Sequence, residues 1–294
     1  MRNNLFRGVT TAMITPFNSD GSVDYEGLRR NTCFQIEHGV RGLLPLGTTG
    51  EAPTLSGEEK EGVVRAVIET ARRQSSEVKV MVGVGTYSTS TTIQNARQAQ
   101  AWGADALLVV TPYYNKPTQE GIVAHFHAIC EAADLPVVVY NIKGRTGVNI
   151  ETPTLARIAE NKNIIGVKEA SGDIIQMMDV LRDIQEIAVY SGDDGITFPL
   201  LSLGGQGVIS VISNLLPTEM VEMVSSALEG QWDRARKIHF HLQPLFKAAF
   251  VETNPAPIKY AMAKRGLAAG PLRLPLVEIS PSSQAKVNAV LDTL

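Results

Sequence analysis

The chain has 294 residues, of which 44% are hydrophobic, and its 27 basic and 30 acidic side chains leave a formal net charge of −3. That length suits one large domain with a small addition, and a near-neutral charge without a basic run argues against nucleic-acid and membrane-surface roles. No apolar stretch approaches the roughly 20 residues of a membrane span, and the N-terminal residues lack the apolar core of a signal peptide. Cys33 and Cys130 fall in amphipathic helical patterns, so we expect reduced core thiols and a cytoplasmic protein.

Short runs rich in β-branched residues alternate with longer segments of helical periodicity, and they do so eight times. Most of these runs are nearly continuous apolar stretches, which is typical of parallel strands covered on both faces. The runs are residues 8–14, 42–47, 78–85, 104–112, 136–142, 164–170, 187–193 and 207–213. Eight β-then-α units without the fingerprint glycines of a dinucleotide fold favour a closed (β/α)8 TIM barrel over an open sheet.

The pattern changes after the eighth run and its helix, which we expect at about 217–229. Residues 231–294 contain no convincing strand pattern. We therefore predict a catalytic barrel over 1–229 and a small C-terminal helical domain over 230–294. The prolines that we expect to break this second part into separate helices are Pro244, Pro255, Pro257, Pro271 and Pro275.

A barrel of this class carries its active site at the carboxyl ends of the strands, and polar residues follow several of the predicted strands. The second strand runs into GTTGE, Gly47 to Glu51, where the backbone can approach a ligand and the hydroxyls of Thr48 and Thr49 suit a small carboxylate. An ordinary glycine turn capped by threonine explains this motif equally well.

Tyrosines end two other predicted strands. Tyr113 and Tyr114 follow the fourth strand, where tandem tyrosines are more often interface or packing residues than acids. Tyr140 ends the fifth strand and either completes the core or transfers protons through its phenol. Arg145, a few residues later, is either a solvated loop residue or binds a substrate carboxylate through two hydrogen bonds from its guanidinium.

Lys168 ends the apolar sixth strand. Side-chain alternation predicts that it shares a face with Ile164 and Gly166, so its ammonium lies on an apolar side of the strand. A lysine whose chain extends to the solvated rim would show the same periodicity. Desolvation, however, lowers the pKa of a buried amine, and the neutral amine attacks ketones to form an imine. We interpret Lys168 as this nucleophile.

Two rival chemistries have weaker support. A metal site needs ligands that converge at strand ends, whereas all five histidines lie in helical patterns, so we expect no metal. A carboxylate pair for hydrolysis is available only as Asp193 and Asp194. Adjacent strand residues point to opposite faces, so these two make a poor pair.

The ordered motifs resemble the dihydrodipicolinate synthase (4-hydroxy-tetrahydrodipicolinate synthase) family of pyruvate-dependent lyases over essentially the whole chain. The shared motifs are GVTTAMITPF, GTTGE, TPYYNKP, YNxxGRTG, GVKEASGD, SGDD, GVISV and ETNPAPIKYA. The resemblance implies that Lys168 forms an imine with pyruvate. It implies that Thr48, Tyr140 and Tyr114 relay protons, with Tyr114 supplied by the neighbouring subunit of a dimer or a dimer of dimers.

The resemblance also implies a substrate site. It assigns Thr49 and the backbone near Ile209 to the carboxylate of pyruvate, Gly47 and Gly192 to substrate binding, and Arg145 to the carboxylate of L-aspartate-4-semialdehyde. The implied reaction joins the pyruvate enamine to this aldehyde, closes a ring and loses water, without a metal or an organic cofactor.

Two other functions stay open. The first is an aldolase for a 2-keto-3-deoxy sugar acid or N-acetylneuraminate, and the second is a non-catalytic barrel that senses a keto acid. Arg145 favours the semialdehyde, but Lys143 replaces the proline expected before Gly144, which we expect to loosen the turn. Lysine-inhibited family members have histidines and polar residues just after GTTGE, whereas this chain has APTLSGEEK, so we expect weak or no inhibition by lysine.

Overall fold

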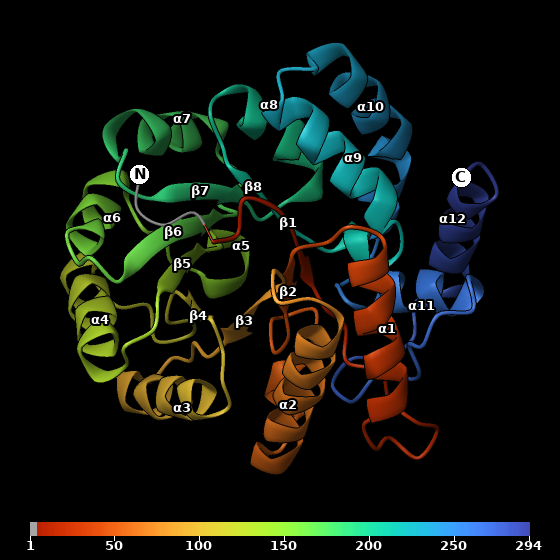
Figure 1. Cartoon of the computed structure of the whole chain (residues 1–294), viewed down its shortest axis with the longest axis horizontal. Coiled ribbons are helices and arrows are strands. Elements are labelled where there is room, and N and C mark those ends of the chain that lie inside the picture. The colour runs from red at the N-terminus through yellow and green to blue at the C-terminus, as the bar shows by residue number, and fades with distance from the viewer. Residues whose placement is uncertain (1–4) are drawn as a thin grey trace.

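Eight parallel strands pair in chain order, and β8 pairs back with β1 to close a barrel (Figure 1). This architecture comes from a computed structural model that describes residues 5–294. The strands are β1 (Gly8–Ala12), β2 (Gly42–Leu44), β3 (Lys79–Gly83), β4 (Ala106–Val110), β5 (Val137–Asn141), β6 (Ile164–Glu169), β7 (Ala188–Ser191) and β8 (Gly207–Ser210). Each lies within a predicted run, and the predicted (β/α)8 barrel is confirmed.

Helices surround the barrel, and all but the last of them lie between consecutive strands of the chain (Figure 1). They are α1 (Tyr25–Glu37), α2 (Gly57–Gln74), α3 (Thr89–Ala101), α4 (Gln119–Ala132), α5 (Lys143–Thr146), α6 (Thr152–Ala159), α7 (Ile174–Asp183), α8 (Thr197–Ser202) and α9 (Pro217–Leu228). Three short 3-10 turns, η1 (Ala52–Thr54), η2 (Asp194–Ile196) and η3 (Ile212–Asn214), follow β2, β7 and β8. These turns lie at the carboxyl ends of their strands, which is the end where polar residues gather.

The apolar core has two parts because each strand is buried on both faces. The larger part lies between the strands and the outer helices. The smaller part fills the inside of the barrel and includes Leu44, Met81, Leu108, Val138 and Ile209. This filled interior forms an apolar floor, as is typical of barrels of this size.

Strand β6 contains an irregularity that corrects one prediction. Val137 of β5 pairs with Ile164, but Val138 pairs with Gly166, so Ile165 is an extra residue. Such a bulge shifts the alternation of side chains. Ile165 belongs to the barrel interior and Ile164 to the outer core. The prediction that Ile164 shares a face with Lys168 is therefore wrong.

The residues after α9 form three helices, α10 (Trp232–Ala248), α11 (Ala256–Lys264) and α12 (Pro281–Leu291). Pro244 lies inside α10 and does not end it, contrary to the prediction. Its exposed position explains this, because water can satisfy the carbonyl that a proline leaves without its helical partner. The predicted boundary at residue 229/230 falls in the turn between α9 and α10; the division into two domains stays a prediction.

A buried ion pair joins this C-terminal region to the loop after β2. Nζ of Lys259, on α11, donates to Oε1 of Glu51 at 2.8 Å, to the carbonyl of Thr15 at 3.1 Å and to that of Pro271 at 2.6 Å. The two charged side chains are 2% and 0% exposed. Glu51 is the last residue of GTTGE, so α11 holds that motif directly.

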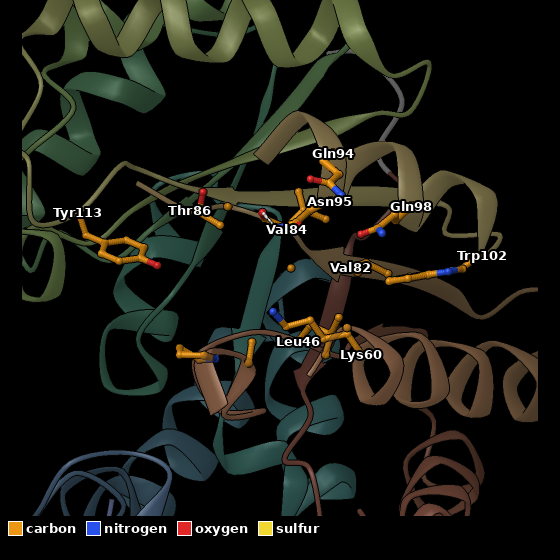
Figure 2. A pocket seen from close by; sticks show the side chains of 15 residues that line it. Leu46, Lys60, Val82, Val84, Thr86, Gln94, Asn95, Gln98, Trp102 and Tyr113 are labelled. Carbon is orange, nitrogen blue, oxygen red and sulfur yellow. Dashed lines mark hydrogen bonds between the residues drawn. The ribbon is translucent and has the colours of Figure 1, made fainter. Parts of the chain in front are cut away.

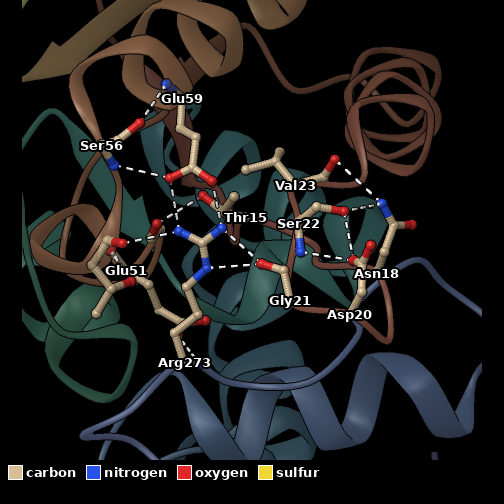
Figure 3. A network of polar contacts seen from close by, with 12 residues as sticks. Thr15, Asn18, Asp20, Gly21, Ser22, Val23, Glu51, Ser56, Glu59 and Arg273 are labelled. Carbon is tan, nitrogen blue, oxygen red and sulfur yellow. Dashed lines mark hydrogen bonds and ion pairs between the residues drawn. The ribbon is translucent and has the colours of Figure 1, made fainter.

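Arg273 extends the same network (Figure 3). Its backbone N–H donates to Oε2 of Glu51 at 3.1 Å, and its guanidinium binds Glu59 at the start of α2 through two hydrogen bonds. The guanidinium also donates to the carbonyl of Gly21 and stacks 4.3 Å from the centroid of the Phe17 ring. The pKa of Glu59 falls to about 2, chiefly because of the hydrogen bonds from Arg273.

No helix within residues 5–294 is both long and apolar enough to cross a membrane. The expected lack of a signal peptide concerns the N-terminus, and residues 1–4 lie outside the described part of the chain.

Candidate active site

The carboxyl ends of β5 and β6 bring two of the predicted residues together. Tyr140 and Lys168 occupy paired positions on these neighbouring strands. Nζ of Lys168 lies 4.3 Å from the centroid of the Tyr140 ring. Lys168 is 5% exposed and Tyr140 is 6% exposed. The amine therefore lies above the barrel floor with an aromatic face beside it and little water around it.

This environment changes the protonation of Lys168. Burial lowers its pKa from 10.5 to about 8, the negative charge of Asp194 opposes the shift, and the positive charge of Arg145 adds to it. At neutral pH about a tenth of such amines are neutral, compared with fewer than about one in a thousand for an exposed lysine. Lys168 thus has the property that a Schiff-base nucleophile requires.

Tyr140 is coupled to Thr48. Burial raises the pKa of Tyr140 to about 12, and the nearby charge of Arg145 and a hydrogen bond with the Thr48 side chain oppose this. The phenol therefore keeps its proton at neutral pH and can pass it along a hydrogen bond. Thr48 itself is exposed at the end of the barrel, so the pair reaches from the buried amine to the opening.

The two predicted glycines differ in what they require. A Cβ on Gly192 would lie 2.7 Å from Cβ of Ala170 and 3.0 Å from Cε of Lys168, so only glycine fits against the lysine side chain. A Cβ on Gly47 would make only an ordinary contact with Leu44. Gly47 lines a cavity of about 130 Å³ with Thr48 and Tyr140, so packing inside the chain does not require glycine there.

Asn254, between α10 and α11, is a site residue that the sequence did not single out. Its Nδ2 donates to Oγ1 of Thr49 at 3.0 Å, and its carbonyl accepts from Nη2 of Arg145 at 3.4 Å. Both Asn254 and Thr49 are buried. Oδ1 of Asn254 is also buried and finds no hydrogen-bond partner within residues 5–294. Its presence in ETNPAPIKYA was the only signal, and helical periodicity gave no reason to expect that it reaches the barrel.

Arg145 lies on the four-residue helix α5, which starts at Lys143. The N–H groups of Arg145 and Thr146 donate to the carbonyl of Ile142, and that of Gly147 donates to the carbonyl of Lys143. The turn is therefore closed, and the loosening expected from Lys143 is not seen. The first turn of a helix needs no proline to form. The guanidinium remains exposed.

Tyr114 is the predicted residue that this single chain does not bring to Lys168. Its side chain is 89% exposed, and its backbone has a φ of +72°. The neighbouring Tyr113 instead lines the cavity above Tyr140 and contacts the ring of Tyr87 edge-on, at 5.5 Å between centroids.

Ile209 is buried in the interior core beside β1. Asp194 was set aside as half of a poor pair with Asp193. It is buried, and burial raises its pKa to about 6. Within residues 5–294, no group of three or more His, Cys, Asp or Glu side chains could hold a metal ion.

A second cavity of about 310 Å³ lies beside the first and shares several of its lining residues, Tyr113 among them. Figure 2 shows Lys60 on one side of it and the amides of Gln94 and Gln98, on α3, on the other. Trp102 closes one end. No aspartate or glutamate lines this cavity in the described part of the chain.

A family model described as the dihydrodipicolinate synthetase family matches residues 5–294. The chain belongs to this family. The family predicted from the motifs is therefore confirmed.

Individual relatives cover almost the whole chain. A 4-hydroxy-tetrahydrodipicolinate synthase from Protochlamydia amoebophila is 49% identical over 292 residues, which cover 98% of this chain and 96% of the relative. A crystal structure of dihydrodipicolinate synthase from Thermotoga maritima superposes with a TM-score of 0.95 at 45% identity, with 98% of both chains covered. A chloride-inhibited enzyme of that name from Acinetobacter baumannii, complexed with pyruvate, gives 0.95 at 38% identity and 98% coverage of both chains. The predicted class of enzyme, a synthase of this type, is thereby confirmed.

The lowered pKa of Lys168 leads to a test by pH. Only the neutral amine attacks a ketone, so labelling of Lys168 by pyruvate and borohydride is expected to accelerate up to about pH 8 and then level off. Below that point the rate changes roughly tenfold per pH unit. Mass spectrometry of the peptide that carries Lys168 measures the rate.

Lys259 is the internal control, because it is equally buried but already donates to Glu51 and two carbonyl groups. We expect no adduct on Lys259. An inflection near pH 10.5, the ordinary lysine value, would contradict the desolvation argument for Lys168.

Proposed function

We propose that the chain joins pyruvate, held as an imine on Lys168, to L-aspartate-4-semialdehyde and so forms 4-hydroxy-tetrahydrodipicolinate for lysine and diaminopimelate biosynthesis. The observation that carries the proposal is the buried Lys168, whose pKa is lowered to about 8 beside Tyr140 at the carboxyl ends of the strands. Membership of the dihydrodipicolinate synthetase family supports the same reaction.

The proposed reaction has three stages: imine formation, C–C bond formation and ring closure. The Lys168 amine replaces the keto oxygen of pyruvate and releases one water. A methyl C–H bond of the imine breaks: its electron pair moves onto the imine to give an enamine, and its proton passes to the hydroxyl groups of Tyr140 and Thr48. The enamine attacks the aldehyde carbon to form a C–C bond, which restores the imine, and the aldehyde oxygen takes up a proton to become the hydroxyl group. The amino group of the semialdehyde then adds to the imine carbon, closes the ring and frees Lys168. The imine is the electron sink when the methyl C–H bond breaks, and the scheme uses no metal and no organic cofactor.

Tyr140 and Thr48 suit proton transfer in this scheme because the Thr48 side chain lies close enough to Tyr140 to lower the pKa of its phenol, and the pair extends from the amine to the opening. We assign them the relay, with Tyr114 of a second subunit as its outer member. The carboxylate of pyruvate goes to Thr49, with Gly47, Gly192 and the backbone near Ile209 around it. Because Asn254 donates to Oγ1 of Thr49, the hydroxyl proton of Thr49 is free to point to that carboxylate.

Arg145 is assigned to the carboxylate of the aldehyde. Within residues 5–294 its guanidinium makes one hydrogen bond, to the Asn254 carbonyl, which leaves most of its donors for an anion. The unpartnered Oδ1 of Asn254 is an acceptor for an amino group of the same substrate. A sugar aldehyde has neither a carboxylate nor an amine for these two groups, which favours the semialdehyde over an aldolase for sugar acids.

The choice of aldehyde is tested by steady-state turnover. We expect aspartate-4-semialdehyde to be condensed with pyruvate far faster than glyceraldehyde or N-acetylmannosamine. Arg145→Ala is expected to raise the KM for the semialdehyde roughly 10- to 100-fold, since a hydrogen bond to a charged group contributes about 1.5–3 kcal/mol. Lys143→Ala, which removes the neighbouring exposed cation, is the matched control and is expected to have a small effect.

Borohydride labelling by pyruvate is expected to remain normal in both variants. Faster turnover of the sugar aldehydes would transfer the assignment to an aldolase. Binding of pyruvate without turnover of any aldehyde would support a keto-acid sensor instead.

We also infer that the chain works as a dimer or a dimer of dimers in the cytoplasm. Tyr114 is almost fully exposed, and the partly exposed rings of Tyr87 and Tyr113 lie beside one another. Aromatic side chains of this kind are enriched at protein interfaces. Cys33 and Cys130 are both free thiols, which suits a reducing compartment.

The contribution of Tyr114 to the active site of the neighbouring subunit is tested by combining two inactive variants. Co-expressed Lys168→Ala and Tyr114→Phe chains form dimers in which one site has both its own Lys168 and the partner's intact Tyr114. With random pairing, about a quarter of the wild-type activity is expected to return, because half of the dimers are mixed and each has one complete site. If Tyr114 served its own chain, the mixture would stay as inactive as its two parents.

The larger cavity supports insensitivity to lysine. Its lining supplies neutral amides from α3 and the ammonium of Lys60, but no carboxylate in the described part of the chain. Free lysine has one carboxylate, which Lys60 can pair with, but also two ammonium groups, which Lys60 repels and for which the described lining offers no opposite charge. We therefore propose that lysine binds this cavity weakly or not at all.

This proposal is tested in a coupled assay of the synthase. Millimolar lysine is expected to leave the initial rate unchanged, whereas a micromolar inhibition constant would disprove the proposal. Lys60→Glu, which exchanges the ammonium for a carboxylate, is the matched variant. It is expected to bind lysine more tightly than the unchanged chain in calorimetry.

A further inference from the structure

Asp194 is a buried carboxyl group for which the proposed reaction has no role. It lies in η2 just after β7 and is 1% exposed, whereas the adjacent Asp193 is partly exposed and binds the N–H of Gly195. Burial of a carboxylate is unfavourable unless hydrogen bonds or an opposite charge compensate it. The hydrogen-bond donors and positive charges around Asp194 therefore determine whether its carboxylate is compensated.

Three neutral donors hold the carboxyl group in place. Oδ1 accepts from Oγ of Ser210 at 2.5 Å, and Oδ2 accepts from the N–H groups of Val211 and Ile212 at 3.0 and 3.3 Å. Oγ of Ser210 in turn accepts from the N–H of Ser213 at 2.9 Å. These contacts fix the position of the carboxyl group, but none of them carries a positive charge.

The network continues away from the site. Oγ of Ser213 hydrogen-bonds with Oγ1 of Thr11 at 2.8 Å, and Thr11 donates to Oε1 of Gln35 on α1 at 2.7 Å. All three side chains are buried. Asp194 is thus held by a rigid chain of hydrogen bonds between β8, β1 and α1, so it cannot turn toward solvent without breaking several of them.

The segment that carries Asp194 packs directly against Lys168. Gly192, two residues before Asp194, packs against the lysine side chain, with room for no more than a hydrogen at that position. Asp194 raises the pKa of Lys168, in opposition to burial and Arg145. Asp193 acts on Tyr140 instead. Glu169, the neighbour of Lys168 on β6, is hydrogen-bonded to Asn141 and to the N–H of Ser171.

We propose that the Asp194 carboxylate is the fixed counter-charge of the Lys168 imine and keeps that imine protonated during the reaction. The proposal rests on the proposed function, in which Lys168 forms an imine with pyruvate. When the ammonium and the ketone give a protonated imine and water, the positive charge stays on the same nitrogen. The protonated imine withdraws the electron pair of the methyl C–H bond more strongly than a neutral imine. Asp194 is a positioning residue in this role, because it acts through Lys168 and does not touch the substrate.

Asp194→Asn tests the proposal, since it removes the charge and preserves the shape. Loss of the negative charge lowers the pKa of Lys168 further, so the acid limb of pyruvate labelling is expected to move about one pH unit lower. The kcat for condensation is expected to fall roughly 10- to 100-fold, because the imine is protonated less often. Faster labelling at low pH together with slower turnover is a combination that a damaged fold does not produce. An acid limb that stays in place would overturn the proposal, whether or not kcat falls.

Two further variants make the result decisive. Ser210→Ala keeps the Asp194 carboxyl group but removes a hydrogen bond that lowers its pKa. Asp194 is then protonated more often at pH 6–7, so the acid limb of Lys168 labelling is expected to move lower by less than in Asp194→Asn. If Asp194→Asn does not fold, an unshifted limb in Ser210→Ala overturns the proposal. Thr11→Val breaks the network between Ser213 and Gln35, away from the carboxyl group, and is expected to leave the acid limb in place. Absence of any Lys168 adduct in the unchanged chain would refute the proposed function itself, which is a different outcome.

Discussion

The ion pair between Glu51 and Lys259 is the constraint on which the geometry of the site depends. Glu51 has a left-handed φ of +52°, and Leu46, at the other end of the same loop, has a φ of +59°. Such conformations are unfavourable by roughly 1–3 kcal/mol each for residues other than glycine and persist where the surroundings fix them. Lys259 and Arg273 provide that fixation from the C-terminal region, so Thr48 and Thr49 are held by residues more than two hundred positions away.

Buried ion pairs of this kind add little net stability. Desolvation of two charges offsets most of their attraction, but removal of one partner is unfavourable by about 3–5 kcal/mol because the other charge stays buried alone. The same reasoning links the pair to catalysis. Lys259 and Lys168 are both desolvated amines, but Lys259 donates to a carboxylate and two carbonyl groups, whereas Lys168 lies over an aromatic ring. That difference separates a structural lysine from a reactive one.

Much of the fold and part of the site could be predicted from the sequence. Continuous apolar runs at regular spacing predicted all eight strands, and the position of Lys168 at the end of an apolar strand predicted that its amine lies on an apolar side. Its place beside Tyr140 was not predicted from this periodicity. Asn254 and Asp194 could not be found in this way. Their importance comes from contacts with Thr49 and Ser210, and periodicity contains no information about contacts between distant segments. Pro244 was misjudged because a proline disrupts a helix less where water replaces the missing hydrogen bond.

The extra residue in β6 has a consequence for how this protein tolerates change. Ile165 and Lys168 are three residues apart, so strict alternation would place them on opposite faces. With the extra residue, Ile165 fills the interior floor and Lys168 also points inward, at the opening. The alternation of inward and outward side chains changes at the bulge. A substitution of similar size there would alter packing only locally. Deletion of one residue would turn either Ile165 or Lys168 away from the barrel interior. This segment therefore tolerates a change of residue far better than a change of length.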